Sequence, residues 1–154
     1  FGTTPVYRKT VVTPNAFELS VLAGMPVLDV ASAAAASLKL GRPLVVAKSV
    51  PLPGRLGAMV HVNGVPFIAA TPIVANPPRR VGDLFAALFF GHYLDGRLTA
   101  QALDLATRGV YHVLMKSAGA PEMNLIAEQE ALVAPPMPEG YSLLPDAAGE
   151  RAHG

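Results

Sequence analysis

The most constraining feature of this sequence is a glycine turn that leads directly into an apolar run. Gly82 and Asp83 precede the segment LFAALFF (84–90), which is apolar on nearly every side of a helix. This pattern is typical of a helix buried in a layered α/β core. A helix N-terminus carries unpaired N–H groups and the positive end of the helix dipole, so it favours anions such as phosphate.

Asp83 has two interpretations at this position. The first is ordinary capping of the helix N-terminus, which the local pattern alone favours. The second is catalytic, because a carboxylate beside a bound phosphate is repelled unless a metal or a reacting proton justifies it. In that case Asp83 could take a proton from a hydroxyl that attacks phosphorus.

A second motif occupies the segment from Thr13 to Glu18. Thr13 is expected to be the N-cap of a helix, with Pro14 in its first position. Asn15 and Glu18 are three residues apart, so they would share one face of the first turn. An amide and a carboxylate placed in this way can hold a hydrated Mg²⁺ ion. Taken alone, the motif favours a plain helix start with Glu18 near the dipole.

Composition excludes several classes of function. The 154 residues make one domain or part of one, and 51% of them are hydrophobic. The net charge is +1, and no basic stripe or aromatic platform indicates nucleic-acid binding. There is no cysteine, which fits a cytoplasmic protein and removes disulfides and thiolate chemistry. No apolar run reaches the roughly 18 residues of a membrane span.

Helical and strand patterns alternate along the chain, which predicts an α/β arrangement. Gly24 is an expected C-cap and Asp29 an expected N-cap. Asn63-Gly64 is a strong signal for a two-residue hairpin turn. The expected helices are 14–23, 30–40, 83–93 and 99–118, the last capped by Thr99, and the expected strands are 10–12, 44–47, 58–62 and 65–70. Residues 50–57 are expected to form a loop, 125–133 a short helix or irregular structure, and 135–154 a poorly ordered tail.

Four blocks of sequence resemble the pyridoxal kinase family of the ribokinase-like superfamily. They are VVTPNAFELSVLAG (Val11–Gly24), LVVAKSVPLPG (Leu44–Gly54), VGDLFAALFFGHYLDG (Val81–Gly96) and MNLIAEQEALVAPP (Met123–Pro136). Their order and spacing fit the C-terminal half of such a kinase. The resemblance extends from Tyr7 to Pro136 and implies the C-terminal portion of a three-layer α/β/α sandwich with a mostly parallel sheet. Residues 1–134 would form its nucleotide and catalytic half, and the front half would be missing.

The resemblance also implies a reaction. It is the ATP-dependent phosphorylation of the 5′-hydroxymethyl group of pyridoxal, and of pyridoxine or pyridoxamine, in vitamin B6 salvage. Asp83 matches the general base of the family. Backbone N–H groups of Val81, Gly82 and Asp83 would stabilise the transferred phosphoryl group together with Mg²⁺. Family members of this kind are expected to be homodimers.

Further positions match the family's nucleotide and metal sites. Asn15 and Glu18 match residues that hold Mg²⁺ through water. Thr13 and Ser49 match residues near the ATP phosphates, at the carboxyl end of the sheet where open α/β sheets bind ligands. The loop 50–57 would then cover the nucleotide. Lys48 stands where some relatives carry threonine, and it either neutralises phosphate charge or reaches solvent.

One departure from the family pattern affects the glycine turn. The usual Gly-x-Gly-Asp is here Arg80-Val81-Gly82-Asp83. Arginine is a poor substitute if this position requires a positive φ. Its guanidinium could instead bind a phosphate oxygen, but damage to the turn is the favoured interpretation.

Two alternatives to a pyridoxal kinase stay open. One is another ribokinase-like kinase, such as a hydroxymethylpyrimidine kinase, although TPNAFEL favours the pyridoxal branch. The other is a catalytically silent remnant that binds nucleotide or a partner, which the missing front half and Arg80 favour. His61, His92 and His112 lack metal-ligand spacing and are expected to be surface or partly buried residues.

Overall fold

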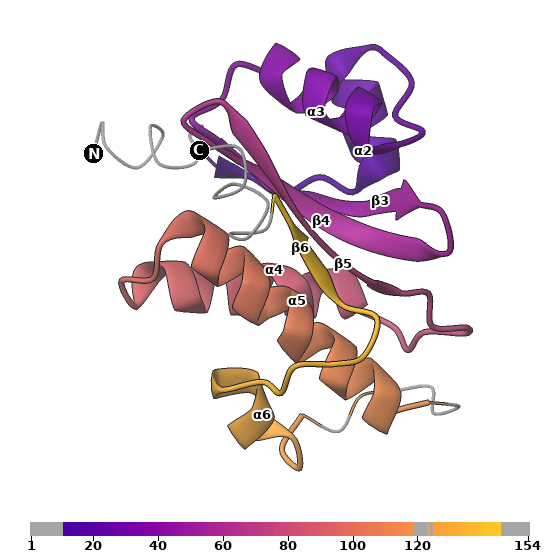
Figure 1. The fold of residues 1–154 in the computed structure, drawn as a ribbon, viewed down its shortest axis with the longest axis vertical. Coiled ribbons are helices and arrows are strands. Elements are labelled where there is room, and N and C mark those ends of the chain that lie inside the picture. The colour runs from indigo at the N-terminus through magenta and orange to yellow at the C-terminus, as the bar shows by residue number, and fades with distance from the viewer. Residues whose placement is uncertain (1–10, 119–122, 124, 146–154) are drawn as a thin grey trace.

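Helices cover both faces of a central layer of strands (Figure 1). The computed structural model describes residues 11–118, 123 and 125–145, and the predictions for residues 1–10, 119–122, 124 and 146–154 lie outside them. The strands are β1 (Val11–Val12), β2 (Leu44–Val45), β3 (Ala47–Leu52), β4 (Arg55–Val62), β5 (Val65–Pro72) and β6 (Ser142–Leu144). The helices are α2 (Ala16–Ala23), α3 (Val30–Lys39), α4 (Val81–Leu94), α5 (Thr99–Lys116) and α6 (Gln129–Val133).

The strands form one parallel pair and one antiparallel sheet. β1 pairs with β2 in parallel, and the order β3-β4-β5-β6 is antiparallel throughout. The expectation of a mostly parallel sheet is therefore wrong for the described residues. The reason is that two-residue turns at Pro53-Gly54 and Asn63-Gly64 reverse the chain, whereas a parallel connection needs a dozen or more residues. The hairpin predicted at Asn63-Gly64 is confirmed, with φ of 51° and 80° at the two residues.

The segment 50–57 is also different from the expected loop. β3 continues through Pro51 to Leu52 and pairs with β4, so most of the segment is hairpin. Pro51 is tolerated because β3 is the edge strand of the antiparallel sheet, where a missing N–H costs little. The segment therefore forms a wall of paired strands and not a loose cover.

Successive residues of β4 supply two separate cores. Ala58 and Val60 face α4 and α5, where they pack with Phe85, Phe89 and other buried residues. Met59 points to the opposite face and packs with the core beneath α2 and α3. This alternation is the two-residue period of a strand that is covered on both sides. The burial predicted for the apolar run 84–90 is confirmed, since Leu84, Phe85 and Phe89 lie in the first of these cores and Leu88 and Phe90 pack against it.

The starts of α2 and α5 differ from prediction. Thr13 is not the N-cap of α2, because Asn15 caps the helix and exchanges hydrogen bonds with Glu18. Thr99 is the first residue of α5, and the preceding Leu98 donates its N–H to Gln101 Oε1 at 3.1 Å. The caps predicted at Asp29 and Gly24 are confirmed.

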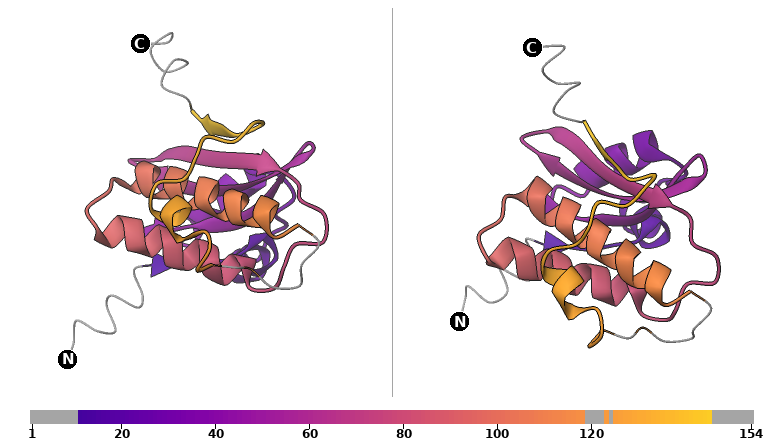
Figure 2. Two further views of the ribbon diagram at one scale, coloured as in Figure 1. Left: turned by 90° about the horizontal axis from the view of Figure 1, so that it is seen from below. Right: turned by 60° about the horizontal axis from the view of Figure 1, so that its bottom comes forward.

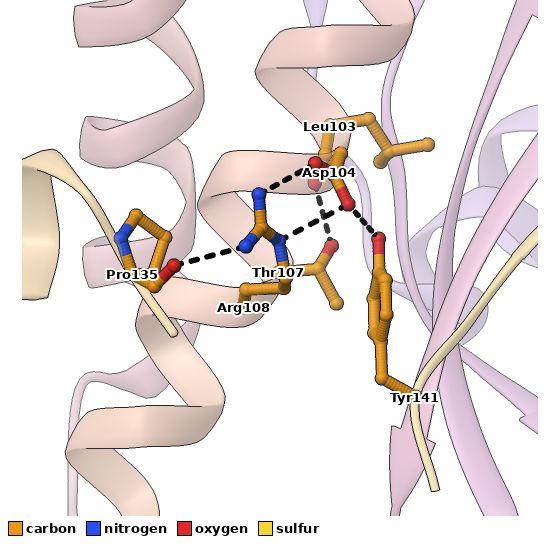
Figure 3. A network of polar contacts seen from close by, with 6 residues as sticks. All are labelled: Leu103, Asp104, Thr107, Arg108, Pro135 and Tyr141. Atoms are coloured by element: carbon orange, nitrogen blue, oxygen red, sulfur yellow. Dashed lines mark hydrogen bonds and ion pairs between the residues drawn. The ribbon is translucent and has the colours of Figure 1, made fainter. Parts of the chain in front are cut away.

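Residues 135–145 are tied to the rest of the molecule, in contrast to the poorly ordered tail predicted over 135–154. β6 pairs with β5, and Figure 2 shows the segment from α6 to β6 crossing over α5. The Tyr141 hydroxyl donates to Asp104, and Arg108 bonds both Asp104 and the Pro135 carbonyl, the latter at 2.9 Å (Figure 3). Burial, and then the contact with Asp104, raises the pKa of Tyr141 far above its usual value.

No helix among the described residues combines the length and apolarity that a membrane crossing requires.

We predict that Tyr141→Phe lowers the free energy of unfolding by about 1–2 kcal/mol, because it removes a hydrogen bond to a charged, part-buried carboxylate. Urea denaturation of the full chain measures the change. Tyr93→Phe is the matched control, since the Tyr93 ring stacks on Phe89 while its hydroxyl bonds no described residue. Equal losses in the two variants would contradict a role for the Asp104 bond.

Candidate nucleotide-phosphate site

A cavity of about 240 Å³ lies between the start of α4, the strands β3 to β5 and the face of α5. Lys48 and Ser49 of β3 and Gly82 of α4 line it, together with largely apolar side chains such as Phe85. An apolar cavity with a few convergent polar groups is the usual form of a small-molecule site.

Lys48 lies against the N-terminus of α4. Its Nζ is 3.4 Å from the position that a β-carbon on Gly82 would occupy. A cation is disfavoured there, because the helix dipole already places positive charge at the same end. An anion between Lys48 and α4 would pair with the ammonium and accept hydrogen bonds from the first N–H groups of the helix. The geometry therefore suits a phosphate group.

The position of Lys48 is fixed by its backbone. Its N–H donates to the Pro14 carbonyl at 2.8 Å, and Asn15 and Lys48 form an isolated parallel bridge. The segment that starts α2 is therefore held beside Lys48, which in turn reaches Gly82. The two motifs singled out in the sequence lie on the same rim, where the chain leaves the carboxyl ends of β1 and β2.

A bulge in β3 directs Lys48 and Ser49 towards the cavity. The register of β3 on β4 shifts between Ala47 and Val50, and Ser49 has a φ of 54°. Bulges bend a strand and re-aim side chains, and they occur often beside functional sites. The left-handed backbone at a serine is a local strain that the surrounding pairing must maintain.

Arg80 has the backbone conformation that glycine adopts most easily. It precedes α4 with φ 67° and ψ 23°, and its side chain makes no capping hydrogen bond. This position therefore requires a positive φ, which makes arginine a poor substitute for glycine here. A left-handed conformation costs a residue with a β-carbon about 1–2 kcal/mol. Arg80 is exposed and does not line the cavity.

Asp83 is the third residue of α4 and is exposed. Its carboxylate forms no hydrogen bond or ion pair with any residue that the structure describes. The capping interpretation is therefore wrong in its strict form, because Arg80 is the N-cap and no side chain caps α4. Asp83 does not line the cavity itself, but it projects from the same first turn as Val81 and Gly82, which do.

Asn15 and Glu18 each use one side-chain oxygen to accept a hydrogen bond from the backbone at the start of α2. Asn15 Oδ1 accepts from the Glu18 N–H at 2.8 Å, and Glu18 Oε1 accepts from the Asn15 N–H at 2.9 Å. The second carboxylate oxygen of Glu18 bonds no group in the part of the chain that the structure describes. This donor set fits contact with a hydrated Mg²⁺ through water, with phosphate oxygens supplying the direct ligands. Among the described residues there is no group of three or more acidic or histidine side chains that could enclose a metal.

The structure separates the predicted site residues into two neighbouring places. Lys48, Ser49, Val81 and Gly82 line the cavity. Thr13 and Glu18 line an adjacent apolar groove along α2. His61, His92 and His112 are partly buried, and His112 bonds Glu128 at 2.7 Å.

Sequence reasoning missed the far wall of the cavity. Gly57 of β4 and the helical face of α5 with Thr107, Tyr111 and Leu114 complete it. The spacing of these α5 residues puts them on one face, which was a usable signal. The contribution of Gly57 depends on the unexpected β3–β4 hairpin, so it had no local signal.

Comparison with known proteins identifies relatives that are about twice as long as this chain. No family model matches the sequence. A pyridoxal kinase of Rubrobacter xylanophilus is 40% identical in an alignment of 137 residues that covers 82% of this chain and 47% of that protein. A pyridoxal kinase of Corynebacterium diphtheriae is 31% identical over 81% of this chain and 47% of its own length. The chain thus spans about half the length of the curated relatives it matches.

Solved structures share the fold over a similar portion. Pyridoxal kinase from Entamoeba histolytica matches with a TM-score of 0.76 and 23% identity, over 87% of this chain and 50% of that one. Pyridoxal kinase from Leishmania donovani in complex with ADP has a TM-score of 0.75 and 23% identity, over 92% and 56%. A putative phosphomethylpyrimidine kinase from Bacteroides thetaiotaomicron has a TM-score of 0.73 and 22% identity, over 88% and 51%.

These neighbours confirm the predicted ribokinase-like α/β fold, and the sequence relatives agree with the resemblance carried by the TPNAFEL and VGDLFAALF segments. Half-length coverage is consistent with the predicted C-terminal half. The chain belongs to the pyridoxal kinase family, and it spans about half the length of the family members that it matches.

Proposed function

We propose that this chain supplies the nucleotide-binding and phosphoryl-transfer half of a kinase that phosphorylates the 5′-hydroxymethyl group of pyridoxal. Pyridoxine and pyridoxamine are further expected substrates, and ATP is the phosphoryl donor. The single observation that carries the proposal is the Lys48 ammonium at the N-terminus of α4. Solved pyridoxal kinases of the same fold in complex with ADP, with pyridoxine and with pyridoxamine support it.

In this proposal the phosphates of ATP lie between Lys48 and the first turn of α4. The N–H groups of Val81, Gly82 and Asp83 point to that space and cost no reorganisation during the reaction. Phosphoryl transfer depends mainly on such positioning and charge stabilisation. The apolar walls of the adjoining cavity suit the base of the nucleotide.

The exposed carboxylate of Asp83 would accept the proton of the 5′-hydroxyl group. The hydroxyl oxygen then bonds to the γ-phosphorus, the bond to the bridging β–γ oxygen breaks, and ADP leaves with that electron pair. Proton transfer of this kind is worth about 10²–10⁴-fold in rate. Asn15 and Glu18 would hold Mg²⁺ through water, and the bound ion would neutralise phosphate charge.

Two other functions have an observation in their favour. The Bacteroides neighbour keeps a hydroxymethylpyrimidine kinase as a candidate. The half-length match and the left-handed Arg80 favour a silent chain that binds nucleotide without turnover. The homodimer and the cytoplasmic location implied by the resemblance stay predictions.

We predict that Lys48→Met weakens ADP binding by about 10- to 100-fold, because it removes a charge-assisted contact worth about 1.5–3 kcal/mol. Isothermal titration calorimetry on the full chain measures the change. Lys116→Met, in the last turn of α5 and away from the cavity, is the control and should leave the affinity unchanged. An unchanged affinity in Lys48→Met would contradict the phosphate site.

We predict that Asp83→Asn lowers pyridoxal-dependent ADP formation by about 10²–10⁴-fold and leaves ADP affinity within a few-fold. Asp95→Asn, at the C-cap of the same helix, is the control and should retain full activity. Normal ADP binding to the unmodified chain with no phosphorylation of pyridoxal would instead support the silent alternative. Turnover of a hydroxymethylpyrimidine in place of pyridoxal would support the other kinase.

We predict that Arg80→Gly raises the free energy of unfolding by about 0.5–1 kcal/mol, because the relief of the left-handed strain exceeds the extra chain entropy of glycine. Nucleotide affinity should rise with it, since the turn at the N-terminus of α4 becomes easier to form. A fall in affinity, measured by the same titration, would show that the guanidinium binds phosphate.

A further inference from the structure

The outer face of α2 is apolar and uncovered. Phe17 is 75% exposed, Val21 65% and Leu22 59%. Phe17 and Val21 are four residues apart and share one side of the helix, and Leu22 lines the same groove beside them. The opposite side is also apolar, with Leu19 and Ala23 buried in the core beneath α2 and α3. A helix that is hydrophobic all round is normally buried on all sides. Within the described residues, the layer that contains α2 therefore lacks a neighbour on this side.

The exposed face of α2 continues onto the edge of β1. Val12, Thr13 and Pro14 line one groove together with Phe17, Val21 and Leu22. Glu18 is the one charged residue among those that line it. The groove therefore favours an apolar occupant and would accept a cationic group at one end.

The main chain of β1 has a second edge available. The carbonyls of Val12 and Pro14 accept from Val46 and Lys48, so they point towards β2 and β3. Main-chain groups of successive residues in a strand point to alternate edges, so those of Val11 and Thr13 are directed away from β2. Among the described residues only β2 pairs with β1. An added strand can bind such an edge by main-chain hydrogen bonds.

We propose that this surface, formed by the outer edge of β1 and by Phe17, Val21 and Leu22 of α2, binds the complementary half of a kinase domain. The occupant contributes a strand that pairs with β1 and an apolar segment that packs on α2. The occupant is identified from the fraction of each relative's length that this chain covers. The chain covers 47% of the Rubrobacter relative and 50% to 56% of the Entamoeba and Leishmania structures, and the uncovered layer needs a neighbour of the kind that the remaining half supplies.

Docking on this surface has a consequence for the proposed transfer site. Glu18 and Thr13 line the groove and also lie beside Lys48 through the Asn15 bridge. An occupant of the groove would cover that side of the phosphate rim and exclude water from it. Only the effect on the phosphate rim rests on the proposed function. Binding of the complementary half to this surface requires no turnover.

The test is co-expression of the full chain with a tagged polypeptide that comprises the half of the Rubrobacter xylanophilus kinase that this chain does not match. We expect a one-to-one complex by affinity capture and analytical ultracentrifugation. Leu22→Glu should weaken the complex at least 10-fold. Leu38→Glu is the matched control and should change it less than 2-fold, since both leucines are 59% exposed and each is the penultimate residue of its helix. Far-UV circular dichroism verifies that both variants fold.

Three results would overturn the inference. They are the absence of a complex, a complex that Leu22→Glu leaves unchanged, and a homodimer of this chain that Leu22→Glu dissociates. The last would assign the surface to a second copy. A complex that forms as expected and yet phosphorylates no pyridoxal would count against the proposed function and leave the binding surface supported.

Discussion

The placement of Lys48 is the interaction on which the candidate site depends. Its backbone N–H donates a hydrogen bond to the Pro14 carbonyl at 2.8 Å, and its ammonium lies next to Gly82 at the start of α4. One residue therefore relates two helix N-termini that are far apart in the sequence. Because its charge opposes the dipole of α4, the arrangement becomes more favourable when an anion lies between them. This is a local cost in stability of the kind that binding sites commonly carry.

Two residues in left-handed conformations flank the same rim. Ser49 follows Lys48 in the bulge of β3, and Arg80 precedes α4. Neither has the freedom of glycine, so each conformation must be maintained by the pairing and packing around it. Ser49 adjoins the residue that carries the ammonium, and Arg80 adjoins the first turn of α4. Strain at Ser49 thus belongs to the bulge that carries Lys48, whereas strain at Arg80 opposes the formation of the turn proposed to bind phosphate.

The parts of the fold that were predicted from sequence are those set by neighbouring residues. The Asn63-Gly64 hairpin and the caps at Gly24 and Asp29 depend on the chemistry of a few adjacent positions. The parts that were missed depend on distant partners. Tyr141 fastens residues 135–145 through Asp104, far away on α5, and nothing in the local composition indicates that bond. The antiparallel pairing of β3 with β4 was missed because Pro51 is compatible both with an edge strand and with a loop.

The candidate site has the same division between local and distant determinants. The resemblance to pyridoxal kinases identified the polar rim, whereas the wall contributed by Gly57 and Tyr111 emerged only from the hairpin and the packing of α5. The rim is also continuous with the uncovered face of α2, since Glu18 belongs to both. Whatever covers that face therefore changes the solvation of the Glu18 carboxylate, which lies near the proposed phosphate position. Charge interactions strengthen as water is excluded, so in the proposed arrangement the contact that covers α2 would also strengthen the charge interactions of the candidate site.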